Sequence, residues 1–374
     1  MILRYGLVLL SFVLSACEQT AQEAPLAVGL ENGSVAAAVN VPIGVEVAAP
    51  NALPKLNALH YALPESAVDS ADLPTVVLQP ASGVDPLPYY EVGRDTYLLF
   101  GNVGSLNSKN RGFNSNAGFV VTSKGVVLID ALGTPMLGRR LIATVAAVTD
   151  LPITHLILTS LESSHSLGSS AIAQLPGVTV IAAASAPAEL SYSDALLTEY
   201  RQRLPEDMQG LRPVSVSKRI VTPRYGYETL LVGEHSFEMY SLAGAALMLY
   251  QVDDDILWLS DLASNQVVPD LSQSDLDLRR QTLEWLQEHF AEVELMVPGH
   301  GSAQSSPFVM LEQNVRYLDG LNVEVKRGFD LGLSLAEILA QVTLLAWSEW
   351  HLYEQHHQAN VRAFYQSLTK SAAQ

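Results

Sequence analysis

Apolar runs separated by polar turns begin near residue 90, and their pattern predicts an α/β protein. The polar stretch 123–125 between two apolar runs predicts a β-hairpin. Further on, apolar residues at helical spacing alternate with short apolar runs, which predicts strand, helix, strand. The expected strands are 97–100, 117–122, 126–129, 154–158, 177–181 and 256–259, and the expected helices are 135–148, 166–175 and 272–293. Polar residues at the ends of such strands are where α/β proteins usually place their sites.

The last third of the chain predicts helices that cover one face of a sheet. Apolar residues between Leu318 and Leu339 form stripes at helical spacing. Arg279 and Arg280, with Glu284 and Glu288, are expected to form charge pairs on a helix surface. The histidines of the C-terminal region are expected at the surface or at helix ends; they are His351, His356 and His357.

The first residues have the organisation of an export signal. A basic start at Leu3-Arg4 precedes an apolar stretch, 5–14, that is too short to span a bilayer. The stretch ends in Leu14-Ser15-Ala16-Cys17, which resembles a bacterial lipobox, and Cys17 is the only cysteine. We therefore expect a signal peptide over 1–16 and a membrane anchor through lipid on Cys17. Glu18, rather than Asp, favours the outer membrane facing the periplasm; the alternative is an ordinary secretory signal.

The segment from 17 to 85 is rich in Ala, Val and Pro and has little periodicity. Such a composition predicts a semi-extended tether. The alternative is a small β-rich cap, because 41–47 could form a strand. We expect one domain over 86–310, with 311–374 as a helical extension of the same domain.

Composition limits the classes of partner. The chain has 374 residues, 48% of them hydrophobic, which suffices for one large domain or two small ones. The formal net charge of −18 would repel a polyanion, so nucleic acid is excluded as an expected partner. A single cysteine also excludes intrachain disulfides.

Five short motifs together resemble the metallo-β-lactamase superfamily in their order and spacing. They are Gly118-Phe119-Val120-Val121, Val127-Leu128-Ile129-Asp130, Thr154-His155-Leu156-Ile157-Leu158-Thr159, Leu257-Trp258-Leu259-Ser260-Asp261 and Val297-Pro298-Gly299-His300-Gly301. The resemblance implies an αββα sandwich, in which two mixed sheets lie face to face, helices cover them and a metal site lies at one edge. The C-terminal stretch resembles the helical tail of periplasmic members close to quinoprotein-associated hydrolases.

The superfamily's metal loop, His-x-His-x-Asp-His, is altered in this chain. Its four ligand positions hold Ser160, Glu162, Ser164 and His165. Where relatives carry a further histidine, the chain has Leu242, which cannot coordinate a metal. The first of the family's two metal sites therefore keeps at most Glu162, and one carboxylate does not make a selective zinc site.

The second metal site keeps three ligand types, because the resemblance assigns it His165, Asp261 and His300. Two histidines and one carboxylate with open positions suit a single Zn²⁺ or Fe²⁺ ion. Glu162 could act as general base in place of the missing loop aspartate. The resemblance assigns Asp130 a structural role behind the ligands.

Three functions from different classes follow. The first is a lipid-anchored hydrolase of an ester-type small molecule with one Zn or Fe ion. The second is a metal-free pseudoenzyme that binds a small ligand or protein partner in the periplasm. The third is an envelope accessory protein that presents its surface on the tether. The alternatives stay open, because His300 lies in a turn that packs well without metal and Asp261 could cap a turn through backbone N–H groups.

Overall fold

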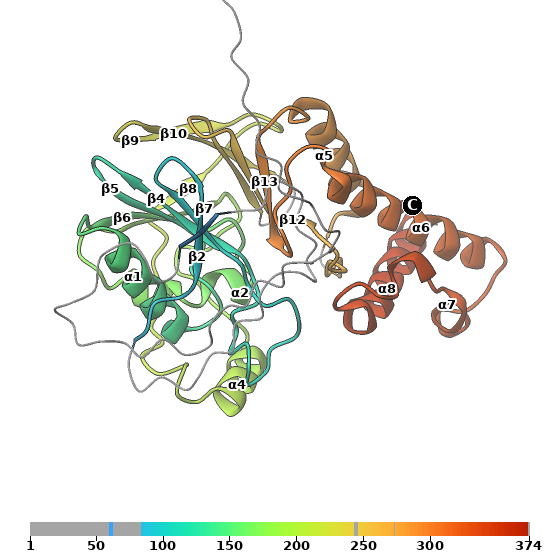
Figure 1. Cartoon of the computed structure of the whole chain (residues 1–374). Helices are drawn as coiled ribbons and strands as arrows, with labels where there is room; N and C mark the ends of the chain where they lie inside the picture. The colour runs from blue at the N-terminus through green and yellow to red at the C-terminus, as the bar shows by residue number, and fades with distance from the viewer. Residues whose placement is uncertain (1–59, 63–83, 243–245, 273, 373–374) are drawn as a thin grey trace, which may run out of the picture. The chain divides into compact units, whose positions relative to one another are not determined.

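The computed structural model describes residues 60–62, 84–242, 246–272 and 274–372, all within the unit Ala48–Gln374. The signal peptide, Cys17, residues 41–47 and most of the expected tether lie outside the described residues. Figure 1 shows strands in two groups with helices beside each group. Within the described part of the chain, no helix has the length and apolar character needed to cross a membrane.

Two mixed β-sheets form the centre of the fold. The first sheet has its strands in chain order: β1 (His60–Ala62), β2 (Tyr89–Gly93), β3 (Thr96–Leu99), β4 (Ala117–Thr122), β5 (Gly125–Ile129), β6 (Ile153–Ile157), β7 (Thr179–Ala183) and β8 (Lys218–Ile220). The second sheet has the order β13 (Leu295–His300), β12 (Ile256–Ser264), β11 (Leu247–Gln251), β10 (His235–Ser241) and β9 (Glu228–Val232). The β4–β5 hairpin is confirmed, with Thr122 paired to Gly125.

Parallel pairing brings the polar ends of several strands to one edge. In the first sheet β5, β6 and β7 run parallel, and in the second β12 and β13 do. Parallel strands end at the same edge, so residues that follow them can meet. Asp130 follows β5, the altered metal loop follows β6, and His300 ends β13.

Three apolar layers make the sandwich. One fills the space between the sheets, with Phe237 and Trp258 facing Val127 and Ile157. A second lies between the first sheet and α1 (Pro135–Val148). The third lies between the second sheet and the helices that follow β12. The αββα architecture with extra C-terminal helices is thereby confirmed.

The remaining helices are α2 (Ser163–Ser166), α3 (Ser169–Ile172), α4 (Asp194–Arg203), α5 (Leu276–His289), α6 (Val309–Asp330), α7 (Leu335–Gln341), the 3₁₀ turn η2 (Leu345–Trp347) and α8 (Tyr353–Ala372). The expected helix over 166–175 is wrong in its extent, because α2 ends at Ser166 and α3 begins at Ser169. Gly168 lies between them and donates its N–H to Leu132 O at 2.8 Å instead of to a helical carbonyl.

The expected surface position of His357 is also wrong. Its side chain is buried between helices, with Nε2 3.1 Å from Val342 O and Nδ1 3.2 Å from the Tyr317 hydroxyl. His356 places Nδ1 2.7 Å from Val268 O. Buried Asn360 accepts from Leu271 N at 2.8 Å. The contacts of His356 and Asn360 fasten α8 to the segment that follows β12, and those of His357 join it to α6 and to the end of α7.

Candidate metal centre

Asp130 at the end of β5 organises the altered loop. Its Oδ1 accepts the Thr159 backbone N–H at 2.7 Å, and its Oδ2 accepts the Thr159 hydroxyl at 2.6 Å. The same Oδ2 lies 2.8 Å from Nδ1 of His165. The backbone at Asp130 is left-handed, with φ 62°, a conformation in which Asp is one of the better-tolerated residues. Asp130 therefore lies behind His165 and contacts Nδ1 of its ring.

His165 in α2 is fully buried. With Nδ1 bound to Asp130, its Nε2 lies 3.1 Å from Asp261 Oδ1. Burial lowers the pKa of His165, but attraction from Asp261 and Asp130 outweighs burial, and the net pKa is raised well above its ordinary value. This histidine therefore lies between two carboxylates that both favour its protonated form.

A distortion of β12 directs Asp261 toward His165. The pairing of β12 with β13 shifts register on either side of Ser260, and Ser260 has φ 54°. Such bulges bend a strand and reorient a side chain, and they are frequent beside active sites. Gly299 on β13 permits the close approach, because a Cβ there would lie 2.8 Å from Asp261 Oδ1.

His300 completes the cluster from the end of β13. Its Nδ1 lies 2.6 Å from Asn114 O, and its Nε2 lies 3.3 Å from Asp261 Oδ1. Asn116 ties β4 to this turn by donating to Pro298 O and Gly301 O, both at 2.8 Å. The rings of His165 and His300 are nearly perpendicular, with centroids 5.3 Å apart.

One ligand atom from each of His165, Asp261 and His300 lies within 4.8 Å of the others. A Zn²⁺ ion with tetrahedral bonds near 2.1 Å separates its ligand atoms by about 3.4 Å. The Nε2–Oδ1 separations of 3.1 and 3.3 Å are close to that value. Both histidines also direct Nδ1 to a protein acceptor, the arrangement that orients metal-binding imidazoles.

Asp261 provides a further test of whether the residues fit a metal. Its Oδ2 is buried and has no hydrogen-bond partner in the described structure. Buried carboxylate oxygens are normally paired or bound to a metal. Burial raises the pKa of Asp261, but the attraction and hydrogen bonds of His165 and His300 outweigh burial and hold it well below the ordinary value. The donor set therefore fits one divalent ion.

Glu162 lies beside the cluster but contributes no ligand atom to it. Its side chain is exposed, yet partial desolvation raises the pKa of its carboxyl, and repulsion from Asp261 and Asp270 raises it further. His165 and His300 act in the opposite direction. The charges of all three cluster residues therefore influence the pKa of the Glu162 carboxyl.

The altered positions make other contacts. Ser160 Oγ accepts from Glu162 N at 3.1 Å, and the backbone O of Ser164 accepts from Ser115 Oγ at 2.6 Å. Leu242 packs against the apolar layer of the second sheet. Among the described residues, only the three-residue cluster offers the ligands for a metal ion.

Arg279 is a site residue that the sequence did not reveal. The expected surface pairing is wrong for Arg279, which is buried and donates Nη2 to the backbone O of Asp261. Arg280 does lie at the surface and pairs with Glu284. Burial lowers the pKa of Arg279 to about 10, against the attraction of Asp261 and Asp270, so it remains charged at neutral pH. No sequence motif shows which of the two adjacent arginines is buried. The rotational position of each residue on helix α5 decides it.

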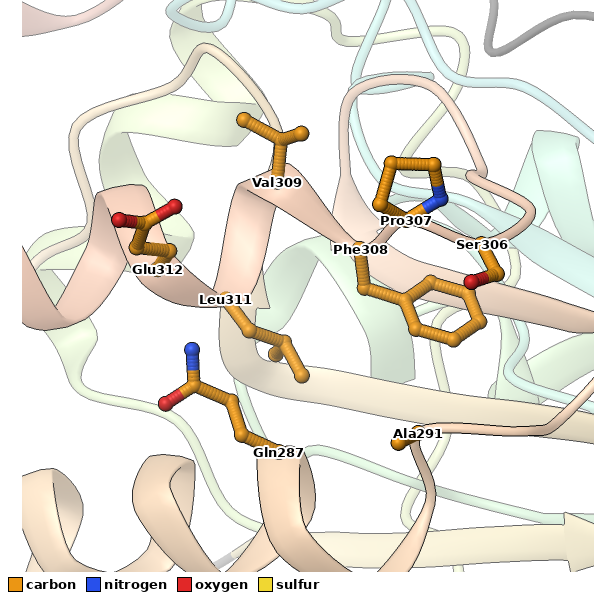
Figure 2. A pocket seen from close by; sticks show the side chains of 8 residues that line it. All are labelled: Gln287, Ala291, Ser306, Pro307, Phe308, Val309, Leu311 and Glu312. Carbon is orange, nitrogen blue, oxygen red and sulfur yellow. The ribbon is translucent and has the colours of Figure 1, made fainter.

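A separate surface pocket of about 290 Å³ lies between the end of α5 and the start of α6 (Figure 2). Its lining mixes apolar and polar residues: Gln287, Ala291, Ser306, Pro307, Phe308, Val309, Leu311 and Glu312. None of them belongs to the metal cluster.

The chain thus combines a two-sheet sandwich with a His-Asp-His cluster at the edge of the sheets. Residues 110–256 match the family model of the metallo-beta-lactamase superfamily, which confirms the resemblance inferred from the sequence motifs. That superfamily usually binds metal ions. No curated protein matches the chain.

Solved structures share the fold at low identity. An inverting sec-alkylsulfatase from Pseudomonas sp. aligns with a TM-score of 0.54 and 17% identity over 75% of this chain. The chain spans 50% of the length of that alkylsulfatase. A metallo-beta-lactamase from Pontibacter korlensis aligns with a TM-score of 0.47 and 16% identity, over 62% of this chain and 99% of its own. The alkylsulfatase alignment supports the fold assignment.

Proposed function

We propose that this protein binds one divalent transition-metal ion, Zn or Fe, through His165, Asp261 and His300 and hydrolyses an ester-type small molecule. The observation that carries the proposal is the convergence of two imidazole Nε2 atoms on one Asp261 oxygen while each Nδ1 is held from behind. The site is a reduced form of the superfamily's two-metal centre, because Ser160 and Leu242 replace ligands of the first metal and Ser164 replaces one ligand of the second.

A bound metal would supply Lewis acidity and lower the pKa of water. The protein residues would hold and orient it: Asp130 and the Asn114 carbonyl fix the two imidazoles. The Glu162 carboxylate would accept a proton from the attacking water. Its raised pKa suits that role, because a base is most effective when its pKa approaches the working pH.

The hydrolase proposal predicts that Glu162→Gln lowers kcat by about 10²-fold or more, the typical contribution of a general base. The measurement is a panel of chromogenic carboxylic and phosphate esters with the metal-loaded full chain. Glu288→Gln, an exposed glutamate on α5, is the matched control and should keep the wild-type rate. Hydrolysis that persists in Glu162→Gln or in excess chelator would exclude this mechanism.

A metal-free binding protein is the second candidate function. The observation in its favour is the contact of His165 with both Asp130 and Asp261, which satisfies a protonated imidazole without any metal. In that state the surface around the cluster would bind a small ligand or a protein partner in the periplasm. Metal content separates the two candidates.

We further propose that Cys17 carries a lipid anchor and that residues 17–85 tether the domain in the bacterial envelope, on the outer membrane facing the periplasm. The basic start, the apolar stretch and Leu14-Ser15-Ala16-Cys17 support this proposal. Anchoring is stable when two or more acyl chains are present. The formal net charge of −18 argues against a nucleic-acid partner.

If Cys17 is lipidated, Cys17→Ala should move the protein from the membrane fraction to the soluble fraction of bacterial cells. Labelling with radioactive palmitate should disappear at the same time. Glu18→Gln keeps the cysteine and should remain in the membrane fraction with its label. A Cys17→Ala variant that stays in the membrane fraction would refute the lipid anchor.

A further inference from the structure

Arg279 carries a buried positive charge that the proposed chemistry does not use. It lies in the first turns of α5, and its side chain is 8% exposed. A guanidinium has five N–H donors, yet the one hydrogen bond of the Arg279 side chain within the described structure goes to the backbone O of Asp261. That bond places the guanidinium directly behind a metal ligand.

The charge has no counter-ion in contact. Asp261 and Asp270 attract it, but neither carboxylate forms an ion pair with it within the described residues. The other two buried arginines of the described residues are paired, Arg111 with Asp207 and Arg140 with Asp85. A buried charge is costly unless it is paired. Arg279 is therefore an exception that an anionic ligand would resolve.

Arg279 has N–H donors that no hydrogen bond of the described structure uses. None of its nitrogens is among the fully buried, unpartnered polar atoms of that structure. The side chains of neighbouring Asp261 and His300 are 29% and 21% exposed. Through its bond to Asp261 O, the guanidinium lies next to this partly exposed cluster. Two neutral histidines, one carboxylate and one divalent ion would leave this region positive.

We propose that Arg279 binds an anionic oxygen group of the substrate, so that the substrate class is small organic molecules bearing a carboxylate, sulfate or phosphate group. The inference rests on the proposed function for the location of the site, but not for the binding event itself. Arg suits this task because its planar fork can form two parallel hydrogen bonds to such a group. Arg279 acts here as a binding residue that orients the substrate beside the cluster.

The test is anion binding to the full chain, with sodium sulfate and sodium acetate as separate probes in isothermal titration calorimetry. We expect the wild type to bind at least one probe, and Arg279→Gln to weaken that binding about tenfold or more, since hydrogen bonds to charged groups are strong. Arg280→Gln, the exposed neighbour on α5, is the matched control and should bind as the wild type does. The preferred probe distinguishes a tetrahedral oxyanion from a carboxylate.

Equal affinity in wild type and Arg279→Gln, or no binding of either probe to the wild type, would overturn the inference. If circular dichroism shows that Arg279→Gln does not fold, Arg279→Lys replaces it: weaker binding supports the inference and unchanged binding overturns it. Each sample is titrated with and without chelator, and its metal content is measured. Arg279-dependent binding in a chain without metal would support this inference and contradict the proposed metal site. A chain that binds metal but shows no Arg279-dependent anion binding would support the metal site and overturn this inference.

Discussion

His165→Ala is expected to abolish metal binding and to lower the free energy of unfolding by about 3–5 kcal/mol, the usual cost of removing one partner of a buried ion pair. The side chain is fully buried and joins Asp130 to Asp261. Its loss leaves the Asp261 carboxylate with His300 as its remaining partner. Urea denaturation in the presence of chelator measures the stability effect without any contribution from metal.

His289→Ala is the matched control for this prediction. His289 is exposed at the end of α5 and contacts Trp285 O at 3.0 Å. Its replacement should change stability by no more than about 0.5 kcal/mol, as is usual for surface substitutions. A His165→Ala variant as stable as this control would mean that the buried pairs contribute nothing to the fold.

Gly168→Ala is expected to destabilise the protein by about 3 kcal/mol or more, at or above the usual cost of overpacking. A Cβ on Gly168 would lie 1.8 Å from Ala131 O, and both groups are backbone-fixed. Ala131 also holds the metal loop, because its backbone N–H donates to His165 O at 2.7 Å. The strain should therefore also weaken metal binding. Thermal and urea unfolding measure the first effect.

Gly320→Ala offers a comparison within a helix. Its added Cβ would meet the ends of the Leu344 side chain at 3.3 and 3.4 Å, and these can move. Alanine also favours a helix over glycine, so the net change should stay within about 1 kcal/mol. If Gly168→Ala were equally mild, the close approach of Gly168 to Ala131 would not constrain the loop.

Much of the fold could be predicted from the sequence because each signal was local. Helix α1 was predicted with the bounds it has, since Pro135 begins a stripe of apolar residues at helical spacing. The prediction of a single helix over 166–175 was wrong, because the tertiary hydrogen bond from Gly168 N–H to Leu132 O interrupts that helix. The predicted surface position of His357 was wrong, because its burial depends on α6 and on the segment ending at Val342. No local sequence pattern reveals these contacts.

The candidate site, like the fold, could be predicted from the sequence only in part. His165, Asp261 and His300 could be named from motifs, and the structure brings them together. The bulge at Ser260 and the role of the Asn114 carbonyl could not be predicted, because both arise from pairing between distant strands. Arg279 was missed because the sequence does not show which of the two adjacent arginines faces Asp261. The orientation of helix α5 decides this, and it directs Arg279 to Asp261 and Arg280 to the surface.

The central claim is that His165, Asp261 and His300 hold one metal ion, and metal content tests it most directly. Elemental mass spectrometry of the full chain, compared with His300→Ala, is the measurement. The account predicts about one Zn or Fe per wild-type chain, the capacity of a single site of this kind, and its loss in the variant. A folded wild-type protein that contains no metal after incubation with Zn²⁺ or Fe²⁺ would contradict the account and leave a binding protein on a metallohydrolase scaffold.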